Sequence, residues 1–206
     1  MDFLKKWLGC IISFIAGVCG LALSACSGMK VLAEIDASAI NSSLSKTSSE
    51  IVKAFKVITD ADLYTQAKDL GITTEFVWLK VFAIITLVVS VALIVWSIVL
   101  LLKNVNVIKV SNNSFNIVTF VLITLLVVAT LGLLISSNVY ASELETALIS
   151  ATKLQYIAGG VPEVALSSII FDINAKVGVY QPTIFVISVI AFIINGIFTF
   201  INKKTA

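Results

Sequence analysis

The sequence predicts an all-α integral membrane protein, with four transmembrane helices and a helical extracytoplasmic cap formed by two outer loops. Three observations support this fold class. Of the 206 residues, 59% are hydrophobic and only 13% are charged, which is about half the charged share of a typical soluble domain. The apolar residues are gathered into four long runs without charge. Each run exceeds the roughly 18–20 residues that a helix needs to cross a bilayer.

The four runs set the boundaries of the elements within a single predicted membrane domain. We expect transmembrane helices at about residues 7–28, 77–102, 117–139 and 181–202. A short inner turn and two outer loops connect them, at residues 103–116, 29–76 and 140–180. Lysines flank the termini and the short turn, as is typical of cytoplasmic segments. The sequence therefore predicts cytoplasmic N- and C-termini in a protein of the plasma (inner) membrane.

Small residues recur along the first predicted helix at steps of three or four. They lie on one helical face and are Gly9, Ser13, Gly17, Gly20, Ser24 and Gly28. Small side chains at this spacing let two helix backbones approach closely in lipid. This set of six residues, named the seam below, predicts one of two arrangements. It packs against another helix of the same bundle, or it associates with a second copy of the chain.

The end of the same run carries a second pattern. Leu23-Ser24-Ala25-Cys26 resembles the lipobox of bacterial lipoproteins. In that family a signal peptidase cuts before the cysteine, which is then lipidated, so the resemblance implies a candidate lipidation site at Cys26 and only three remaining spans. The apolar stretch before Cys26 is longer than the roughly 7–15 residues of a signal segment. We therefore expect an uncleaved first span.

Both outer loops carry apolar residues at helical spacing among polar ones. In the first loop these residues are Leu32, Ile35, Ile40, Leu44, Ile51, Phe55 and Ile58. In the second loop they are Leu144, Leu148, Ala151, Leu154, Ala158, Val164, Leu166, Ile169 and Ile170. The spacing is typical of amphipathic helices. Because neither apolar stripe suits water on its own, we expect the two loops to pack together as a helical cap.

Few polar side chains lie in the interiors of the predicted spans, and none of these is charged. The absence of charge argues against an ion-coupled transporter. Thr86, Ser90 and Ser97 share a face of the second span. They either line a narrow polar path or form hydrogen bonds to their own helix or a neighbour. Asn195 in the fourth span is expected to form an interhelical hydrogen bond.

The available residue types exclude most catalytic and ligand-binding chemistry. The sequence has no histidine, and all 14 of its basic residues are lysines. It therefore lacks the usual general base, the commonest metal ligand and the bidentate phosphate clamp. We expect no enzyme activity, no cofactor and no metal site. A net charge of +2 does not favour a nucleic-acid partner.

These features favour a non-catalytic membrane subunit that assembles with itself or with larger membrane partners. Its expected partners are the lipid bilayer and other membrane subunits, or further copies of the chain in a homo-oligomer. A passive channel or pore-forming oligomer is the alternative, based on the hydroxyl face of the second span. A membrane immunity protein against a pore-forming toxin is the second alternative, because such proteins share this layout.

Overall fold

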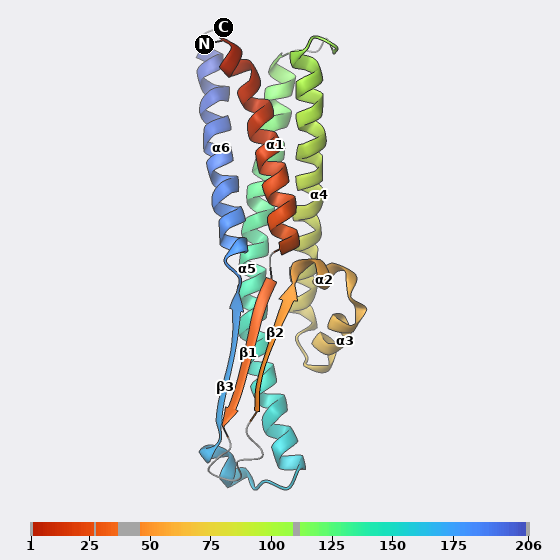
Figure 1. Ribbon diagram of the computed structural model, residues 1–206, viewed down its shortest axis with the longest axis vertical. Coiled ribbons are helices and arrows are strands. Elements are labelled where there is room, and N and C mark those ends of the chain that lie inside the picture. Colours follow the sequence, from red (N-terminus) through yellow and green to blue (C-terminus); the bar gives the residue numbers. More distant parts are fainter. Residues whose placement is uncertain (1, 27, 37–45, 109–111, 205–206) are drawn as a thin grey trace. The chain divides into compact units, whose positions relative to one another are not determined.

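The computed structural model describes residues 2–26, 28–36, 46–108 and 112–204, and most of them are helical (Figure 1). The chain divides into two compact units. Unit 1 comprises Met1–Cys26, Val81–Leu134 and Val179–Ala206, and unit 2 comprises Ser27–Lys80 and Ile135–Gly178. The boundary between the units falls within two long helices, α4 (Thr73–Asn104) and α5 (Asn112–Ala158).

Three helices in the described part of the chain are long and apolar enough to cross a membrane. They cover Thr73–Asn104, Phe115–Ala158 and Tyr180–Ile197. The first two of these segments contain the second and third predicted spans, and Tyr180–Ile197 covers most of the fourth. Their length and composition are consistent with a membrane protein. The first predicted span corresponds to α1 (Asp2–Cys26), whose apolar part is the shorter segment Trp7–Ala22.

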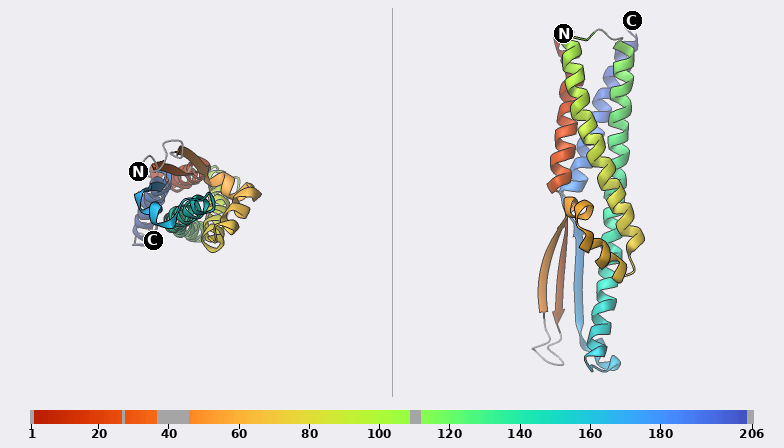
Figure 2. Two further views of the ribbon diagram at one scale, coloured as in Figure 1. Left: turned by 90° about the horizontal axis from the view of Figure 1, so that it is seen from below. Right: turned by 90° about the vertical axis from the view of Figure 1, so that its right-hand side faces the viewer.

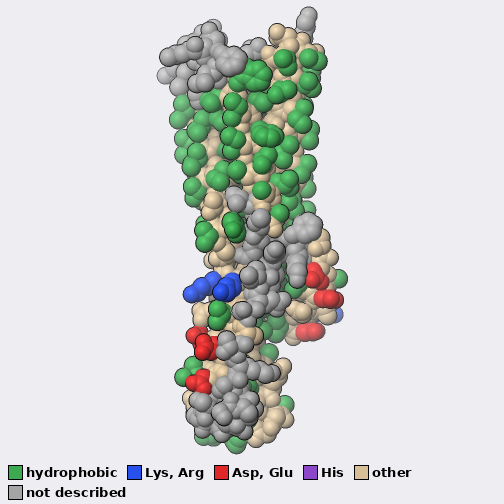
Figure 3. Space-filling view, viewed as in Figure 1, with side chains coloured by type: hydrophobic (Ala, Val, Ile, Leu, Met, Phe, Trp, Pro, Cys, Tyr) green, Lys and Arg blue, Asp and Glu red, His purple; other side chains and the backbone are tan. Residues whose placement is uncertain are grey.

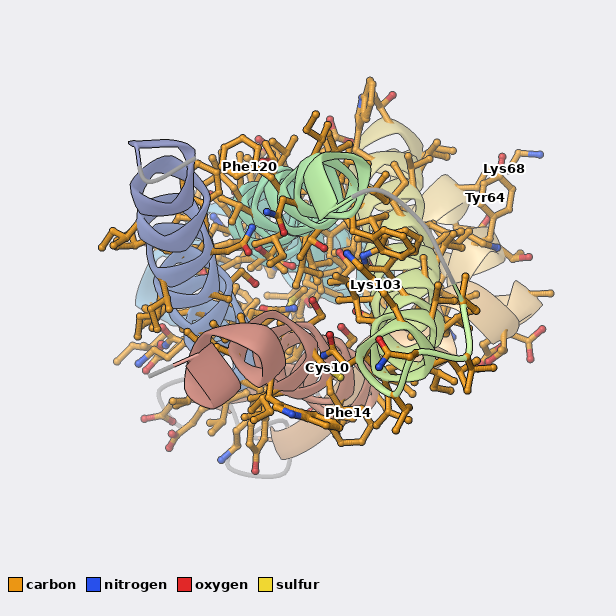
Figure 4. The ribbon with its side chains drawn as sticks, turned by 90° about the horizontal axis from the view of Figure 1, so that it is seen from above. Cys10, Phe14, Tyr64, Lys68, Lys103 and Phe120 are labelled. Atoms are coloured by element: carbon orange, nitrogen blue, oxygen red, sulfur yellow. The ribbon has the colours of Figure 1, made fainter. Side chains whose placement is uncertain are left out.

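Within the described residues, unit 1 is a bundle of α1, α6 (Tyr180–Lys204) and the adjoining parts of α4 and α5. Seen along the bundle, α1 lies between α4 and α6 (Figure 4). All four helices contribute to one apolar core, made of Ala16, Val89, Leu93, Ile123, Leu126 and Ala191. Hydrophobic side chains also cover the outside of this unit (Figure 3). An apolar core inside an apolar exterior is typical of helices that sit in lipid.

Unit 2 contains an antiparallel β-sheet where the sequence predicted helices. The strands found among the described residues are β1 (Gly28–Asp36), β2 (Lys46–Lys53) and β3 (Ile170–Val177). Their order is β2-β1-β3, so β1 is central. Met29 of β1 lies opposite Val177 of β3, and Ile35 lies opposite Phe171. The prediction of an all-helical cap is therefore wrong in these segments.

Alternation of apolar and polar residues explains the strands. Phe171, Ile173 and Val177 alternate with polar residues along β3. Because side chains two residues apart point to the same face of a strand, this pattern creates one apolar face. The same alternation runs through β1, but Leu32 interrupts it and lies three residues before Ile35. That helical spacing suggested an amphipathic helix, although β1 pairs with its neighbour β2 and with β3, which lies far away in the sequence.

The apolar face of the sheet packs along the second half of α5 (Figure 2). The rings of Tyr156 and Phe171 meet edge to face with 5.9 Å between their centroids. Lys153 Nζ lies 5.7 Å from the centre of the same Phe171 ring. Ile173 is 3% exposed. After α5 the chain enters a 3-10 helix, η2 (Glu163–Ser168), which leads directly into β3.

Two short helices, α2 (Ala54–Thr59) and α3 (Ala61–Asp69), connect β2 to α4. An aromatic series holds α3 against the parts of α4 and α5 that belong to the same unit. The Tyr64 and Phe76 ring centroids are 6.1 Å apart, and those of Phe76 and Tyr140 are 5.8 Å apart. Phe76 is 1% exposed. Burial of its large apolar ring between Tyr64 and Tyr140 therefore stabilises the packing of α3 on α4 and α5.

Candidate functional site

The main candidate site is the face of α1 that packs against α4, because it contains the middle of the seam. The Cys10 thiol donates a hydrogen bond to the backbone carbonyl of Ser97, with 3.2 Å between sulfur and oxygen. Farther along α1, Gly17 lies against Ser90 and Ile94. The two helices therefore run antiparallel. Figure 4 shows Cys10 directed into the bundle, whereas Phe14 of the same helix points outward.

Gly17 and Gly20 lie so close to α4 that neither position has room for a side chain. A Cβ atom at Gly17 would lie 2.8 Å from Ile94 Cγ1 and 2.9 Å from the backbone oxygen of Ser90. A Cβ atom at Gly20 would overlap Ser90 Oγ and lie 3.3 Å from Ser90 Cβ. Small residues let helices approach in this way. Within this chain, the centre of the seam therefore forms a contact between α1 and α4.

The remaining seam residues have other surroundings. Ser13 and Ser24 are both buried in α1. Gly9 has nothing within 4 Å of its hypothetical Cβ atom. The sequence placed Gly28 on the same helical face, but α1 ends at Cys26 and Gly28 is the first residue of β1. Because the alternating pattern of β1 begins there, the helix cannot continue to position 28.

The three hydroxyl residues of the predicted polar path are all buried in α4. Each donates its hydroxyl proton to a backbone oxygen of its own helix. Thr86 Oγ1 lies 2.8 Å from Phe82 O, Ser90 Oγ lies 2.7 Å from Thr86 O, and Ser97 Oγ lies 2.6 Å from Ile94 O. These bonds satisfy the donors locally. The arrangement provides small buried side chains at the helix contact, and Ser90 is the one that faces the seam.

Asn195 is buried in α6, with 7% of its surface exposed. The nearby contact between α6 and α5 is aromatic. The Phe120 and Phe192 ring centroids are 5.2 Å apart, and a Cβ atom at Gly196 would lie 3.9 Å from Phe120 Cε2. This is ordinary van der Waals distance, so the two helices pack here through rings rather than through glycine.

Sequence reasoning missed a close contact between α4 and α5. The ring of Phe82 lies against Gly132, where a Cβ atom would be 2.7 Å from Phe82 Cζ and closer still to two other ring atoms. Gly132 lies in an apolar run with Ala129 three residues before it and Ser136 four residues after it, a spacing of small residues like that of the seam. Only its large aromatic partner on another helix reveals its role, and that pairing is not visible in the sequence.

A second missed group joins α4 and α5 near their connecting turn. Trp96 Nε1 donates a hydrogen bond to Thr119 Oγ1 at 2.8 Å, and the Trp96 and Phe115 rings stack with centroids 5.2 Å apart. Lys103 Nζ lies 4.2 Å from the centre of the Phe115 ring, within the range of a cation–π interaction. Figure 4 shows Lys103 at this end of the bundle, directed inward.

The candidate lipidation residue Cys26 is the last residue of α1, and its side chain lies outside the described set. Among the residues that the structure describes, no three His, Cys, Asp or Glu side chains come together in a way that could hold a metal ion.

Comparison with known proteins gives no relative from which a function could be transferred. No family model matches the chain, and no curated protein matches it in sequence.

Proposed function

We propose that the chain is a non-catalytic, four-span membrane subunit that assembles with itself or with other membrane subunits. The observation that carries the proposal is the set of exposed apolar side chains at one end of unit 2. Val164 is 87% exposed, Leu154 66%, Ile170 63% and Ile157 42%. Gathered apolar exposure of this kind typically marks a protein–protein or membrane contact.

The end of α5, η2 and the start of β3, which carry these four residues, lie at the same end of unit 2 (Figure 1). The sheet contacts α5 through Phe171, on the side of Tyr156 and Lys153. Four apolar side chains stay outside that contact and are exposed: Leu154, Ile157, Val164 and Ile170. We refer to these four residues as the apolar end. In the proposed subunit, the apolar end is covered by another protein chain.

The four-span part of the proposal rests on α1. Its uncharged part runs from Trp7 to Cys26, about 30 Å at 1.5 Å per residue, which matches a hydrocarbon core of about 30 Å. Ala16 of α1 packs in the same core cluster as residues of α4, α5 and α6. On the opposite side, Ile11, Phe14 and Ile15 are each about half exposed. A helix buried on one side and apolar on the other is suited to face both a bundle and lipid.

The proposed orientation places both termini in the cytoplasm, in a plasma (inner) membrane. This orientation is supported by the lysines at the ends of the chain and beside the short turn, which are Lys5, Lys6, Lys103, Lys203 and Lys204. An excess of lysine near short segments is typical of the cytoplasmic side. An accessible tag at either end, tested for protease protection in sealed vesicles, would show the same side for both.

The assembly proposal is tested by expressing two differently tagged copies of the chain in its native host and purifying through one tag. Native mass spectrometry then gives the mass of the complex. We expect a complex larger than one chain, containing either the second tag or a stoichiometric partner. A single chain under gentle extraction contradicts the proposal.

The double substitution Leu154→Ser and Val164→Ser should reduce the complex about tenfold, because two exposed apolar contacts of roughly 1 kcal/mol or less each are removed. Glu163→Gln with Ser167→Ala is the matched control, since it changes two exposed residues of η2 without removing apolar surface. Equal losses in both variants would place the assembly contact elsewhere.

A further inference from the structure

Two lysines lie directly opposite each other on the face of the sheet that points away from α5. Lys30 of β1 is the register partner of Lys176 of β3. Side chains in such positions point to the same face, with Cβ atoms about 4.5–5.5 Å apart. Both lysines are exposed, whereas Met29 and Ile173, which point to the other face, are buried. The register therefore brings two ammonium groups together on one surface.

The neighbours of this lysine pair do not neutralise it. The next pair on the same face is Leu32 and Asn174, and the acidic pair Glu34 and Asp172 follows it. Four residues of a strand span about 13 Å, too far for direct ion pairing. Neither lysine forms an ion pair with any side chain that the structure describes. Figure 3 shows the lysine and acidic side chains as separate groups on this face.

Like charges directly opposite each other destabilise a sheet. The acidic pair cannot relieve this repulsion at its distance. An anion bound between the two ammonium groups would relieve it, and would give this register a function. Lysine ammonium groups bind phosphate as point charges and donate charge-assisted hydrogen bonds to its oxygens. The chemistry of the pair therefore fits a phosphate group.

The position of the lysines along the chain indicates where the phosphate comes from. Lys30 lies four residues after Cys26, the last residue of α1, and Lys176 lies four residues before Tyr180, the first residue of α6. Four residues reach at most about 14 Å. A headgroup region extends roughly 6 Å beyond the hydrocarbon core on each side of a bilayer. Allowing for the long lysine side chains, both ammonium groups are within reach of lipid headgroups.

We propose that Lys30 and Lys176 together bind the phosphate of one anionic lipid headgroup on the extracytoplasmic side of the membrane. This site also explains why lysines occur near boundaries where the cytoplasmic preference of lysine would not place them. The proposal depends on α6 crossing the membrane and on the pairing of β1 with β3. It does not depend on whether the chain assembles with partners.

The test uses the full-length protein in detergent, titrated with phosphatidylglycerol and followed by native mass spectrometry. Lys30→Gln/Lys176→Gln should bind this lipid about thirtyfold more weakly than the wild type, since each juxtamembrane lysine contributes about a fivefold effect. Lys68→Glu is the charge-matched control, because it lowers the net charge by the same two units at an exposed residue of α3, outside the sheet. The control should bind like the wild type.

Four outcomes would overturn the proposal. Equal binding by the wild type and the Gln pair would show that the lysines do not form the site. Equal weakening in the control would show that the effect depends only on net charge. Displacement of the lipid by millimolar inorganic phosphate would assign the site to a soluble anion. Phosphatidylcholine, a zwitterionic lipid, is titrated in parallel, and if its binding depends on the two lysines to the same extent, the site is not selective for anionic lipid.

The double substitution Lys30→Arg/Lys176→Arg keeps both charges. It provides a second test of the site in case the Gln variant does not fold. This pair should retain lipid binding within about threefold of the wild type, because arginine also donates to phosphate oxygens. If the Gln variant does not fold, the Arg pair and the single Lys176→Gln variant still decide the question. Loss of binding in the Arg pair at unchanged helix content would contradict a phosphate site.

Discussion

The ring of Phe82 lies against the backbone of Gly132, so closely that a Cβ atom there would be 2.7 Å from Phe82 Cζ. This contact joins α4 and α5 inside unit 1. Gly132→Ala forces the ring to move, and overpacking of this kind costs about 1–3 kcal/mol. We expect the midpoint of thermal unfolding in detergent to fall.

Gly196→Ala is the matched control for that substitution. It also adds one methyl group to a predicted transmembrane helix, but the nearest atom, Phe120 Cε2, would be an ordinary 3.9 Å away. Alanine is the better helix former by about 1 kcal/mol. The control should therefore unfold at the same temperature or higher. Similar destabilisation in both variants would contradict the contact between Phe82 and Gly132.

Gly17→Ala should separate α1 from α4. The new methyl group would meet the backbone oxygen of Ser90 at 2.9 Å, and a backbone atom cannot move away as a side-chain end can. We expect the free energy of unfolding to fall by about 1–3 kcal/mol. The measurement is the unfolding of α1 in mixed micelles, which should occur more readily in the variant. Gly9→Ala, with open space around position 9, should be neutral. An altered oligomer mass without loss of stability would instead indicate that the seam contacts a second copy.

Gly20 and Ser90 should show coupling in a double-mutant cycle. A methyl group at position 20 overlaps Ser90 Oγ, whereas Ser90 Cβ would remain 3.3 Å away. Ser90→Ala removes the obstructing oxygen and should restore at least half of the stability lost in Gly20→Ala. The interaction energy expected for residues in direct contact is about 0.5–3 kcal/mol. Additive effects of the two substitutions would show that they are not in contact.

Phe171→Leu should loosen the sheet of unit 2. The change removes the edge-to-face contact with Tyr156 and the cation–π contact with Lys153, which together contribute about 1–2 kcal/mol. Hydrogen exchange of the β1 and β3 amides should accelerate as a result. Ile170→Leu is the control, because Ile170 is 63% exposed. Unchanged exchange in Phe171→Leu would mean that the ring does not hold the sheet on α5.

The membrane helices were predictable because an uncharged run of sufficient length needs no information from elsewhere in the chain. Val81–Leu102 and Val110–Ser142 indicate α4 and α5 by composition alone. The spacing of small residues in the first helix also indicated a close helix contact at Gly17 and Gly20. It could not identify α4 as the neighbouring helix. Gly132 was missed because its spacing from Ala129 and Ser136 does not reveal that the Phe82 ring packs against it.

The sheet was missed for a different reason. The clean alternation of β3, with Phe171 and Ile173 on one face and Asp172 and Asn174 on the other, was available as a local signal but was not used, because the predicted helical stripe ended at Ile170. Leu32 obscured the corresponding pattern in β1. Since the pairing of β1 with β3 depends on a distant partner, local spacing alone favoured the wrong element.

The pairing of β1 with β3 also determines the order in which the chain can fold. The two strands are separated in the sequence by β2 and by helices α2 to α5. During synthesis β1 can pair early with β2, but its other edge stays open until β3 has been made and the helices between them are in place. An open edge is prone to pair with other chains. A ribosome that stops before Ile170 therefore releases a protein whose central strand has one unpaired edge, and quality control that detects this edge would remove truncated copies.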